Sequence, residues 1–135
     1  ADYTSNCLEP TYPDGLDVEV ISAAALKTSW QKADLASERE HVTLYVRNHQ
    51  QDFRIQHLIR DGESLLGRRW TVDHPEDLAL VNNIYEALYP DNAHFSTDDV
   101  LNYLRAHPQL EDMNRDIVRN EGMIKSIHND QQITP

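Results

Sequence analysis

Asp73 is the side chain whose place in the sequence best suits chemistry. It follows the short stretch Trp70-Thr71-Val72 and stands two residues before Pro75, near which a helix is expected to begin. In open α/β sheets, ligands bind beyond the carboxyl ends of the strands. A carboxylate at such an end can hold Mg²⁺ against a bound phosphate, since hard cations prefer oxygen ligands. Asp is also a common helix cap, and spacing alone favours that simpler role.

Asp17 and Glu19 form a second pair of candidate residues. They alternate with apolar residues through the stretch 16–21, and this period of two predicts a strand with both carboxylates on one face. Paired carboxylates on one face can bind a cation or accept hydrogen bonds from sugar hydroxyls. The alternative is a polar strand face turned toward solvent, which the pattern alone favours.

Three other residues give weaker signals. Glu38 and His41 have the i, i+3 spacing of di-iron proteins, but those proteins need the motif on two helices and no second copy is present. Cys7 has no activating pattern nearby, which indicates a structural thiol rather than a nucleophile. The sequence contains no Walker loop, no G-x-G-x-x-G, no G-x-S-x-G and no H-E-x-x-H.

The charge balance restricts the possible partners. Twelve basic residues stand against 23 acidic ones, giving a net charge of −11. Such a field repels a phosphate backbone, so we expect no nucleic-acid binding. The tight basic cluster Arg68-Arg69, with Arg60 a little upstream, is sufficient for one small phosphate-bearing ligand.

Composition also predicts the compartment. No apolar run approaches the roughly 20 residues that span a bilayer, and no export signal opens the sequence. The single cysteine agrees with a reducing environment. We therefore expect a cytoplasmic protein without a membrane partner.

The pattern of elements predicts an α/β fold in a single domain over residues 1–135. Residues 1–90 are expected to contain the sheet and helices, and residues 91–135 a helical and irregular tail that is irregular from Asn114. Strands are predicted near the start of the chain and at 16–21, 53–58 and 70–72, and helices from Ser22, Ser37, Pro75, Ser96 and Pro108. Strands that alternate with helices are typical of a mostly parallel, layered sheet.

Several stretches together resemble the cytidylyltransferase family that includes spore coat polysaccharide biosynthesis proteins, a family similar to the synthetases that activate Kdo and sialic acids. Their order and spacing through nearly the whole chain carry the resemblance. The stretches are Asp2-Tyr3, Ser5-Asn6, 13–20, 37–43, 69–78, Asn114 and 119–122.

The resemblance implies a Rossmann-like nucleotidyltransferase fold that joins a sugar to a nucleotide from CTP, with Mg²⁺, and releases pyrophosphate. It implies that Asp73 ligates the metal, and that Asp17, Glu19 and Arg69 contact the substrate. Sugar or sugar nucleotide would be the ligand, and the 37–43 segment would lie near the sugar site and a dimer contact.

The resemblance is partial. The family's first strand, its glycine- and basic-rich phosphate loop and its first metal-binding Asp have no counterpart in this sequence. We therefore expect a partial fold that lacks the N-terminal nucleotide-binding half and is inactive by itself. A homo-oligomer is also expected, because half a sheet leaves a strand edge to be covered. The alternative function is a non-catalytic binding or oligomeric assembly module derived from that fold.

Overall fold

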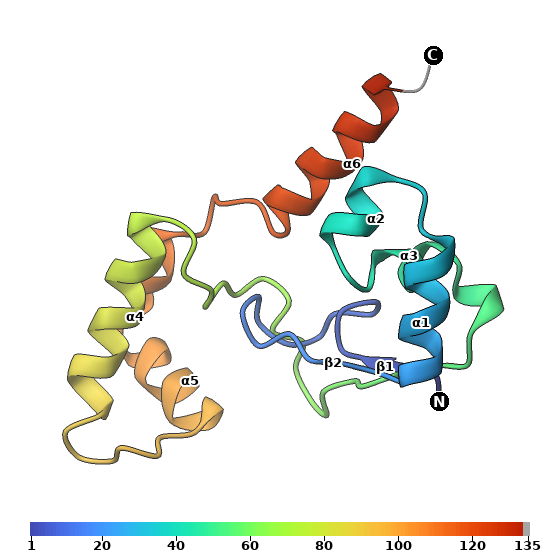
Figure 1. Ribbon diagram of the computed structural model, residues 1–135. Coiled ribbons are helices and arrows are strands. Elements are labelled where there is room, and N and C mark those ends of the chain that lie inside the picture. Colours follow the sequence, from blue (N-terminus) through green and yellow to red (C-terminus); the bar gives the residue numbers. More distant parts are fainter. Residues whose placement is uncertain (134–135) are drawn as a thin grey trace. The chain divides into compact units, whose positions relative to one another are not determined.

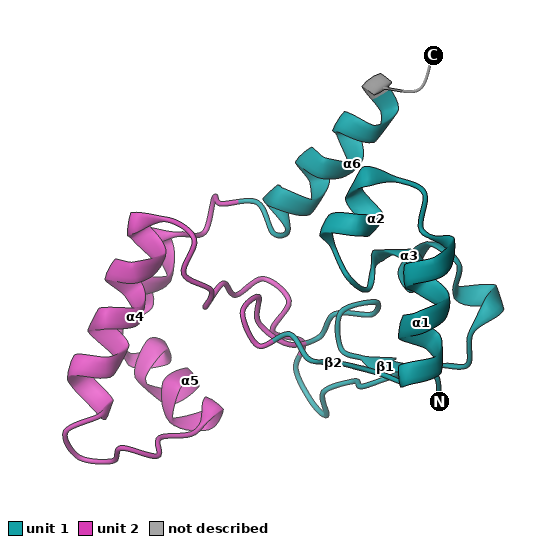
Figure 2. Ribbon diagram, in the orientation of Figure 1, with its two compact units in different colours: residues 1–11, 17–63, 118–135 teal, residues 12–16, 64–117 magenta. Residues whose placement is uncertain are grey.

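The structure is a computed structural model that describes residues 1–133 (Figure 1). It separates into two compact units (Figure 2). Unit 1 contains residues 1–11, 17–63 and the segment that starts at Val118, and unit 2 contains residues 12–16 and 64–117. The predicted division at residue 90 does not coincide with a boundary of these units, and the single domain stays a prediction.

The sheet belongs to unit 1. It consists of β1 (Tyr3–Ser5), β2 (Glu19–Ile21) and β3 (Ile55–His57), in the order β2-β1-β3 (Figure 1). β1 pairs with β2 in antiparallel and with β3 in parallel orientation. The strands predicted at 16–21 and 53–58 exist but are shorter. The described sheet is mixed, so the prediction of a mostly parallel sheet was wrong.

Helix α1 (Ala23–Lys32) follows the sheet as predicted. The side chain of Ser22 caps it by accepting a hydrogen bond from the backbone N–H of Ala25 at 3.1 Å. Ala25 and Ser29 are buried on one face of α1, and the helix packs against α3. A capping serine before an alanine-rich stretch was sufficient to locate this element.

The next predicted helix is divided and starts differently. The structure has α2 (Ala36–Glu40), α3 (Leu44–Asn48) and a 3₁₀ turn, η1 (Gln50–Asp52). Leu35 is the N-cap of α2, without a side-chain hydrogen bond, and Ser37 is buried inside the helix. The capping box expected at Ser37 was therefore wrong.

A further helix lies in the segment predicted to be irregular from Asn114. Helix α6 spans Glu121–Ile133 and is preceded by Asn120, whose φ of 57° is left-handed. The backbone N–H of Ser37 donates to the carboxylate of Asp130 at 3.2 Å, which joins α6 to α2. This contact is remote in sequence, so local patterns did not reveal it.

Unit 2 is built on helices. α4 (Pro75–Leu88) and α5 (Thr97–Ala106) begin where predicted, and η2 (Pro108–Met113) is a 3₁₀ helix. Apolar residues spaced at helical intervals meet between α4 and α5 and form the core of the unit. These core residues are Leu80, Ile84, Val100 and Leu104.

The strand predicted at 70–72 is not formed. The described residues of unit 2 contain one isolated bridge, in which Asp14 pairs in parallel with Arg69. The backbone N–H of Asp14 donates to the carbonyl of Arg68, and the N–H of Trp70 donates to the carbonyl of Asp14. This bridge fixes the chain just before Asp73.

Large apolar side chains are exposed on each unit. Trp30 and Val20 of unit 1 are 69% and 62% exposed, and Tyr89 and Val72 of unit 2 are 53% and 52% exposed. None of the helices between residues 1 and 133 has both the length and the apolar character needed to cross a membrane. The predicted homo-oligomer stays a prediction.

Candidate functional site

Arg69 is the centre of a buried charge cluster in unit 2. Its Nε and Nη2 donate to the two carboxylate oxygens of Asp77, both at 2.9 Å, in a bidentate pair. Its Nη1 donates to Asp14 at 2.9 Å. The side chain of Arg69 is only 8% exposed, and those of Asp14 and Asp77 are 10% and 0% exposed. These contacts raise the pKa of Arg69, chiefly through the hydrogen bonds to Asp77.

A tight backbone approach holds this cluster together. Gly15, next to Asp14, has a φ of 99°, which only glycine adopts without strain. A Cβ atom on Gly15 would lie 2.5 Å from the backbone nitrogen of Thr71. Glycine at this position therefore allows the 12–16 segment to lie against the chain that carries Arg69.

Asp77 connects the cluster to α4. It is the third residue of the helix and accepts hydrogen bonds from the backbone N–H groups of Asp73 and His74 at 3.1 and 3.0 Å. The side-chain amide of Asn114 donates to Asp77 at 2.8 Å and to the carbonyl of Arg69 at 2.9 Å. Burial acts to raise the pKa of Asp77, but the hydrogen bonds from Arg69 and Asn114 outweigh it and hold this pKa below its usual range.

Asp73 lies at the open side of the cluster. Its side chain is 65% exposed, and its Oδ2 accepts hydrogen bonds from Arg69 Nη2 at 3.1 Å and from Thr71 at 3.4 Å. The N-cap of α4 is His74 rather than Asp73. The alternative that Asp73 merely caps this helix is therefore wrong, and its carboxylate is directed to solvent instead.

The donor set around Asp73 limits the kind of metal site that is possible. Within residues 1–133, no group of three or more His, Cys, Asp or Glu side chains is arranged to hold a metal ion. Mg²⁺ commonly binds through one or two carboxylates together with phosphate oxygens and waters. The single exposed carboxylate of Asp73 is compatible with such a magnesium site, in which the substrate supplies further ligands.

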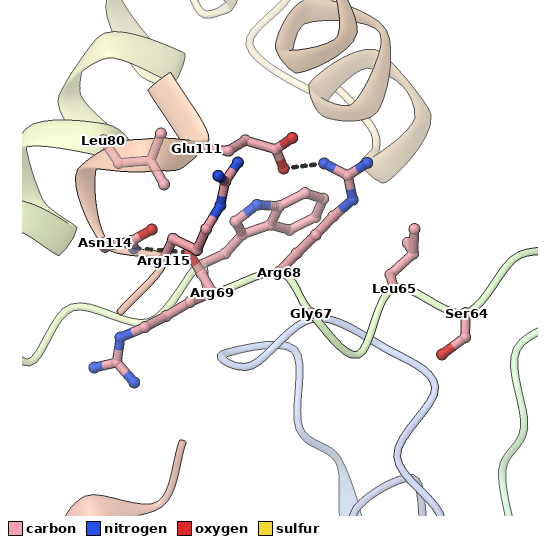
Figure 3. A pocket seen from close by; sticks show the side chains of 10 residues that line it. Ser64, Leu65, Gly67, Arg68, Arg69, Leu80, Glu111, Asn114 and Arg115 are labelled. Carbon is pink, nitrogen blue, oxygen red and sulfur yellow. Dashed lines mark hydrogen bonds and ion pairs between the residues drawn. The ribbon is translucent and has the colours of Figure 1, made fainter. Parts of the chain in front are cut away.

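Arg68 and Arg69 point in different directions although they are consecutive (Figure 3). Arg68 pairs with Glu111 beside a cavity of about 230 Å³, and Arg115 at the rim of that cavity pairs with Asp112. Arg69 lines the same cavity and is paired with Asp14 and Asp77, so all three arginines there are paired with carboxylates. The expected phosphate-binding role of the Arg68-Arg69 cluster stays a prediction.

A second polar cavity lies in unit 1 and contains the two other predicted residues. Asp17 and Glu19 line the same cavity of about 310 Å³, although Glu19 begins β2 and Asp17 precedes this strand. Arg119 donates to Asp17 at 2.6 Å, and Arg47 lies 3.8 Å from Glu19. Asn120 also lines this cavity, which therefore combines acceptors, cations and an amide.

The hydrogen bonds of Glu19 fix its carboxylate at this cavity. Tyr3 donates to one oxygen at 2.6 Å and Thr43 donates to the other at 2.7 Å. Burial and the bond to Glu19 raise the pKa of Tyr3 above its ordinary value. Burial likewise raises the pKa of Cys7, a further lining residue, which favours the neutral thiol over a nucleophilic thiolate.

Sequence reasoning missed several residues of the charge cluster around Arg69 and of the cavity in unit 1. Asp14 and Asp77 were not assigned to a site, although each lies in a stretch on which the resemblance rests. Arg47 and Arg119 were missed because their contacts join residues far apart in the sequence. The signal that could have found Arg119 is the 119–122 motif, whose place beside Asp17 only the structure gives.

Comparison with known proteins identifies the fold. No protein-family model matches the chain, and no curated protein matches its sequence. Among solved structures, the chain is similar to a cytidylyltransferase from Leptospira borgpetersenii serovar Hardjo-bovis, with a TM-score of 0.76 and 20% identity. The match covers 87% of this chain and 47% of that protein, so the chain spans about half of its length. The chain thus shares the α/β fold of about half of that cytidylyltransferase, which confirms the expected fold class.

Proposed function

We propose that this chain supplies the sugar side and one metal ligand of a cytidylyltransferase, which joins a sugar to a nucleotide from CTP for surface glycan synthesis. The observation that carries this proposal is the fold likeness, which extends over 87% of the chain to a protein described as a cytidylyltransferase. The exposed Asp73 and the cavity with Asp17 and Glu19 give the fold two separate polar sites, one in each unit.

In this proposal, Asp73 is the residue that would hold Mg²⁺. A bound Mg²⁺ would neutralise charge on the phosphate groups of CTP. Asp73 suits this role because its carboxylate is exposed and is not used as the cap of α4. Arg69 was expected to contact substrate, and that role stays a prediction.

The cavity in unit 1 is the proposed sugar site. A sugar presents hydroxyl groups that both donate and accept hydrogen bonds, so its site needs both kinds of partner. Asp17 and Glu19 can accept from hydroxyls, while Arg47, Arg119 and the amide of Asn120 can donate to them. All five residues line one cavity, and this supports the assignment.

The proposal assigns to this chain only part of a complete site. The chain corresponds to 47% of the similar cytidylyltransferase, and no phosphate-binding loop was found in its sequence. Nucleotidyl transfer requires stabilised charge at the α-phosphate as well as an oriented nucleophile. We therefore propose that this chain by itself binds ligand but does not transfer the nucleotide.

Thermal unfolding with and without CTP plus Mg²⁺ tests this function. Ligand at about 100 times its dissociation constant should stabilise the fold by about 2.7 kcal/mol. The stabilisation should require Mg²⁺ and should disappear in Asp73→Asn. Asp91→Asn, which changes an exposed aspartate elsewhere in unit 2, should behave like the wild type. Stabilisation that is equal with and without Mg²⁺, or that persists in Asp73→Asn, would contradict the metal role.

A second candidate function is an oligomeric assembly module without chemistry. The observation that favours it is the exposure of Trp30 on α1 and of Val20 on the edge strand β2. Exposed apolar side chains of this kind are common at protein interfaces. This function predicts a midpoint of thermal unfolding that rises with protein concentration and does not respond to CTP.

A further inference from the structure

We propose that Arg69 is a positioning residue that fixes the carboxylate of Asp73, rather than a residue that contacts substrate. The inference rests on the proposed metal role of Asp73 and adds a function for the buried cluster behind it.

The hydrogen bonds of Arg69 leave it poorly placed to bind a ligand. Its guanidinium makes four hydrogen bonds to three carboxylates, those of Asp14, Asp73 and Asp77. It is 8% exposed, so a ligand could reach it only after these bonds break. Removing one partner of a buried ion pair leaves an uncompensated charge and strongly destabilises the folded protein. Replacement of a carboxylate partner of Arg69 by a ligand is therefore unfavourable.

The same hydrogen bonds make Arg69 a rigid support. The planar guanidinium is held on one side by the bidentate pair with Asp77 and on another by Asp14. Asn114 ties the backbone of Arg69 to Asp77 as well. Because Asp77 belongs to α4 and Asp14 to the bridged segment, the guanidinium is fixed by two separate parts of unit 2.

This support acts on one oxygen of Asp73. Both hydrogen bonds to the carboxylate fall on Oδ2, from Arg69 and from Thr71. Neither of the hydrogen bonds to the Asp73 carboxylate in the described part of the chain involves Oδ1. Fixing one oxygen selects the orientation of the carboxylate, and it leaves the other oxygen for a cation. Such support of a ligand by an outer residue typically raises metal affinity.

The charge of Arg69 does not prevent a cation from binding. A lone guanidinium 3.1 Å from Asp73 would oppose a metal ion by Coulomb repulsion. Here the carboxylates of Asp14 and Asp77, each 2.9 Å from the guanidinium, exceed its charge by one negative unit. The cluster behind Asp73 therefore orients the carboxylate while the net charge stays favourable to a divalent cation.

NMR of the full chain tests this inference through the side-chain torsion of Asp73. Three-bond couplings should report one χ1 rotamer in the wild type and rotamer averaging in Arg69→Lys, which keeps the charge but loses the planar fork. Arg68→Lys, at the neighbouring arginine, is the matched control and should retain the single rotamer. Backbone amide shifts of α4 and α5 establish that each variant is folded. If Arg69→Lys fails to fold, Asp14→Asn removes one anchor of the guanidinium and should also release the rotamer.

Titration with Mn²⁺, observed as paramagnetic broadening of the Asp73 signals, separates this inference from the proposed function. The Mn²⁺ midpoint should rise about 10-fold or more in Arg69→Lys and stay unchanged in Arg68→Lys. A single Asp73 rotamer that persists in a folded Arg69→Lys would overturn the positioning role. If the rotamer is released as expected but Mn²⁺ never broadens the wild-type signals, the positioning role stands and the metal role of Asp73 fails.

Discussion

Asp73 and Asp77 both bind Arg69, yet their surroundings give them different roles. Asp77 is fully buried and accepts hydrogen bonds from Arg69, Asn114 and the start of α4, whereas Asp73 is 65% exposed. In water, an exposed ion pair contributes little because solvent screens it. In the interior, the loss of one partner leaves an uncompensated charge. Asp77 is therefore the structural residue of the two, and Asp73 is the one open to a ligand.

The substitution Asp77→Asn tests this division of roles. It keeps the size of the side chain but removes the charge opposite Arg69, so we expect the free energy of unfolding to fall by about 3–5 kcal/mol. Asp73→Asn removes the exposed partner of the same arginine and should change it by at most about 1 kcal/mol. Urea denaturation of both variants measures the difference. Equal losses would show that burial does not separate the two carboxylates.

The hydrogen bond from Tyr3 to Glu19, at the cavity in unit 1, predicts that the stability of the fold depends on pH. Burial and the bond to Glu19 raise the pKa of Tyr3 in the folded state above the unfolded value of about 10. The contribution of Tyr3 to the free energy of unfolding is fully present below a pH of about 10, and it is lost as the pH rises through the folded-state pKa. We expect Tyr3→Phe to be less stable near neutral pH, by about 1.5–3 kcal/mol for a bond to a charged acceptor.

The stability gap between wild type and Tyr3→Phe should narrow as the pH rises above about 10, since only the wild type loses this contribution. Denaturation curves between neutral and alkaline pH measure the gap. Tyr89→Phe, at a tyrosine that is 53% exposed, is the control for the loss of a tyrosine hydroxyl outside this cavity. A constant gap for Tyr3→Phe would contradict the raised pKa.

At the scale of single elements, the start of a helix could be predicted from the sequence where the capping residues are close to one another in the chain. Ser96 and Asp99 bond reciprocally at the start of α5, as a capping box does. Ser37 and Glu40 have the same spacing, but the N–H of Ser37 binds Asp130 from α6 instead. The two patterns look alike in the sequence, and only a tertiary partner distinguishes them.

The candidate sites were predictable to a similar degree. The alternation around Asp17 and Glu19 predicted a strand face that carries both carboxylates, but Asp17 lies outside β2. The structure brings both residues to one cavity, and their role there stays a prediction. The partner of Asp17, Arg119, lies 102 residues away in the sequence. Likewise, the approach of Asp14 to Arg69 depends on one bridge that is too short to leave a strand pattern. Residues joined by long-range contacts were therefore beyond sequence reasoning.

A substitution at Gly15 tests the close approach of the 12–16 segment to the backbone at Thr71. Gly15→Ala places a Cβ atom 2.5 Å from the backbone nitrogen of Thr71 in a residue whose φ is 99°. Backbone cannot move aside as a flexible side chain can, so we expect a loss of about 1–3 kcal/mol or more in the free energy of unfolding. Gly67→Ala, at a glycine with open space around it and no such φ, should have little effect. Thermal denaturation compares the two, and similar midpoints would contradict the close approach.

At the scale of the molecule, the chain order and the compact units do not coincide. Unit 2 contains residues 12–16 and 64–117, so it interrupts unit 1 twice along the sequence. Each unit has buried residues of its own, with Leu44, Tyr45 and Val46 in unit 1 and the α4–α5 core in unit 2. Local patterns predict helices and strands but not this exchange of segments, because it is decided by packing.

Two cores predict two regions of separate local stability, which hydrogen exchange can resolve. Leu104 is fully buried in the unit 2 core, and Leu104→Ala should cost about 2–5 kcal/mol. We expect amide exchange to accelerate in α4 and α5 and to change much less in β1, because cooperative units open separately. Leu44→Ala, which truncates a leucine that is 3% exposed in unit 1, should give the reverse pattern. If either variant accelerated exchange equally in both units, the chain would unfold as one cooperative body and the two cores would not be independent.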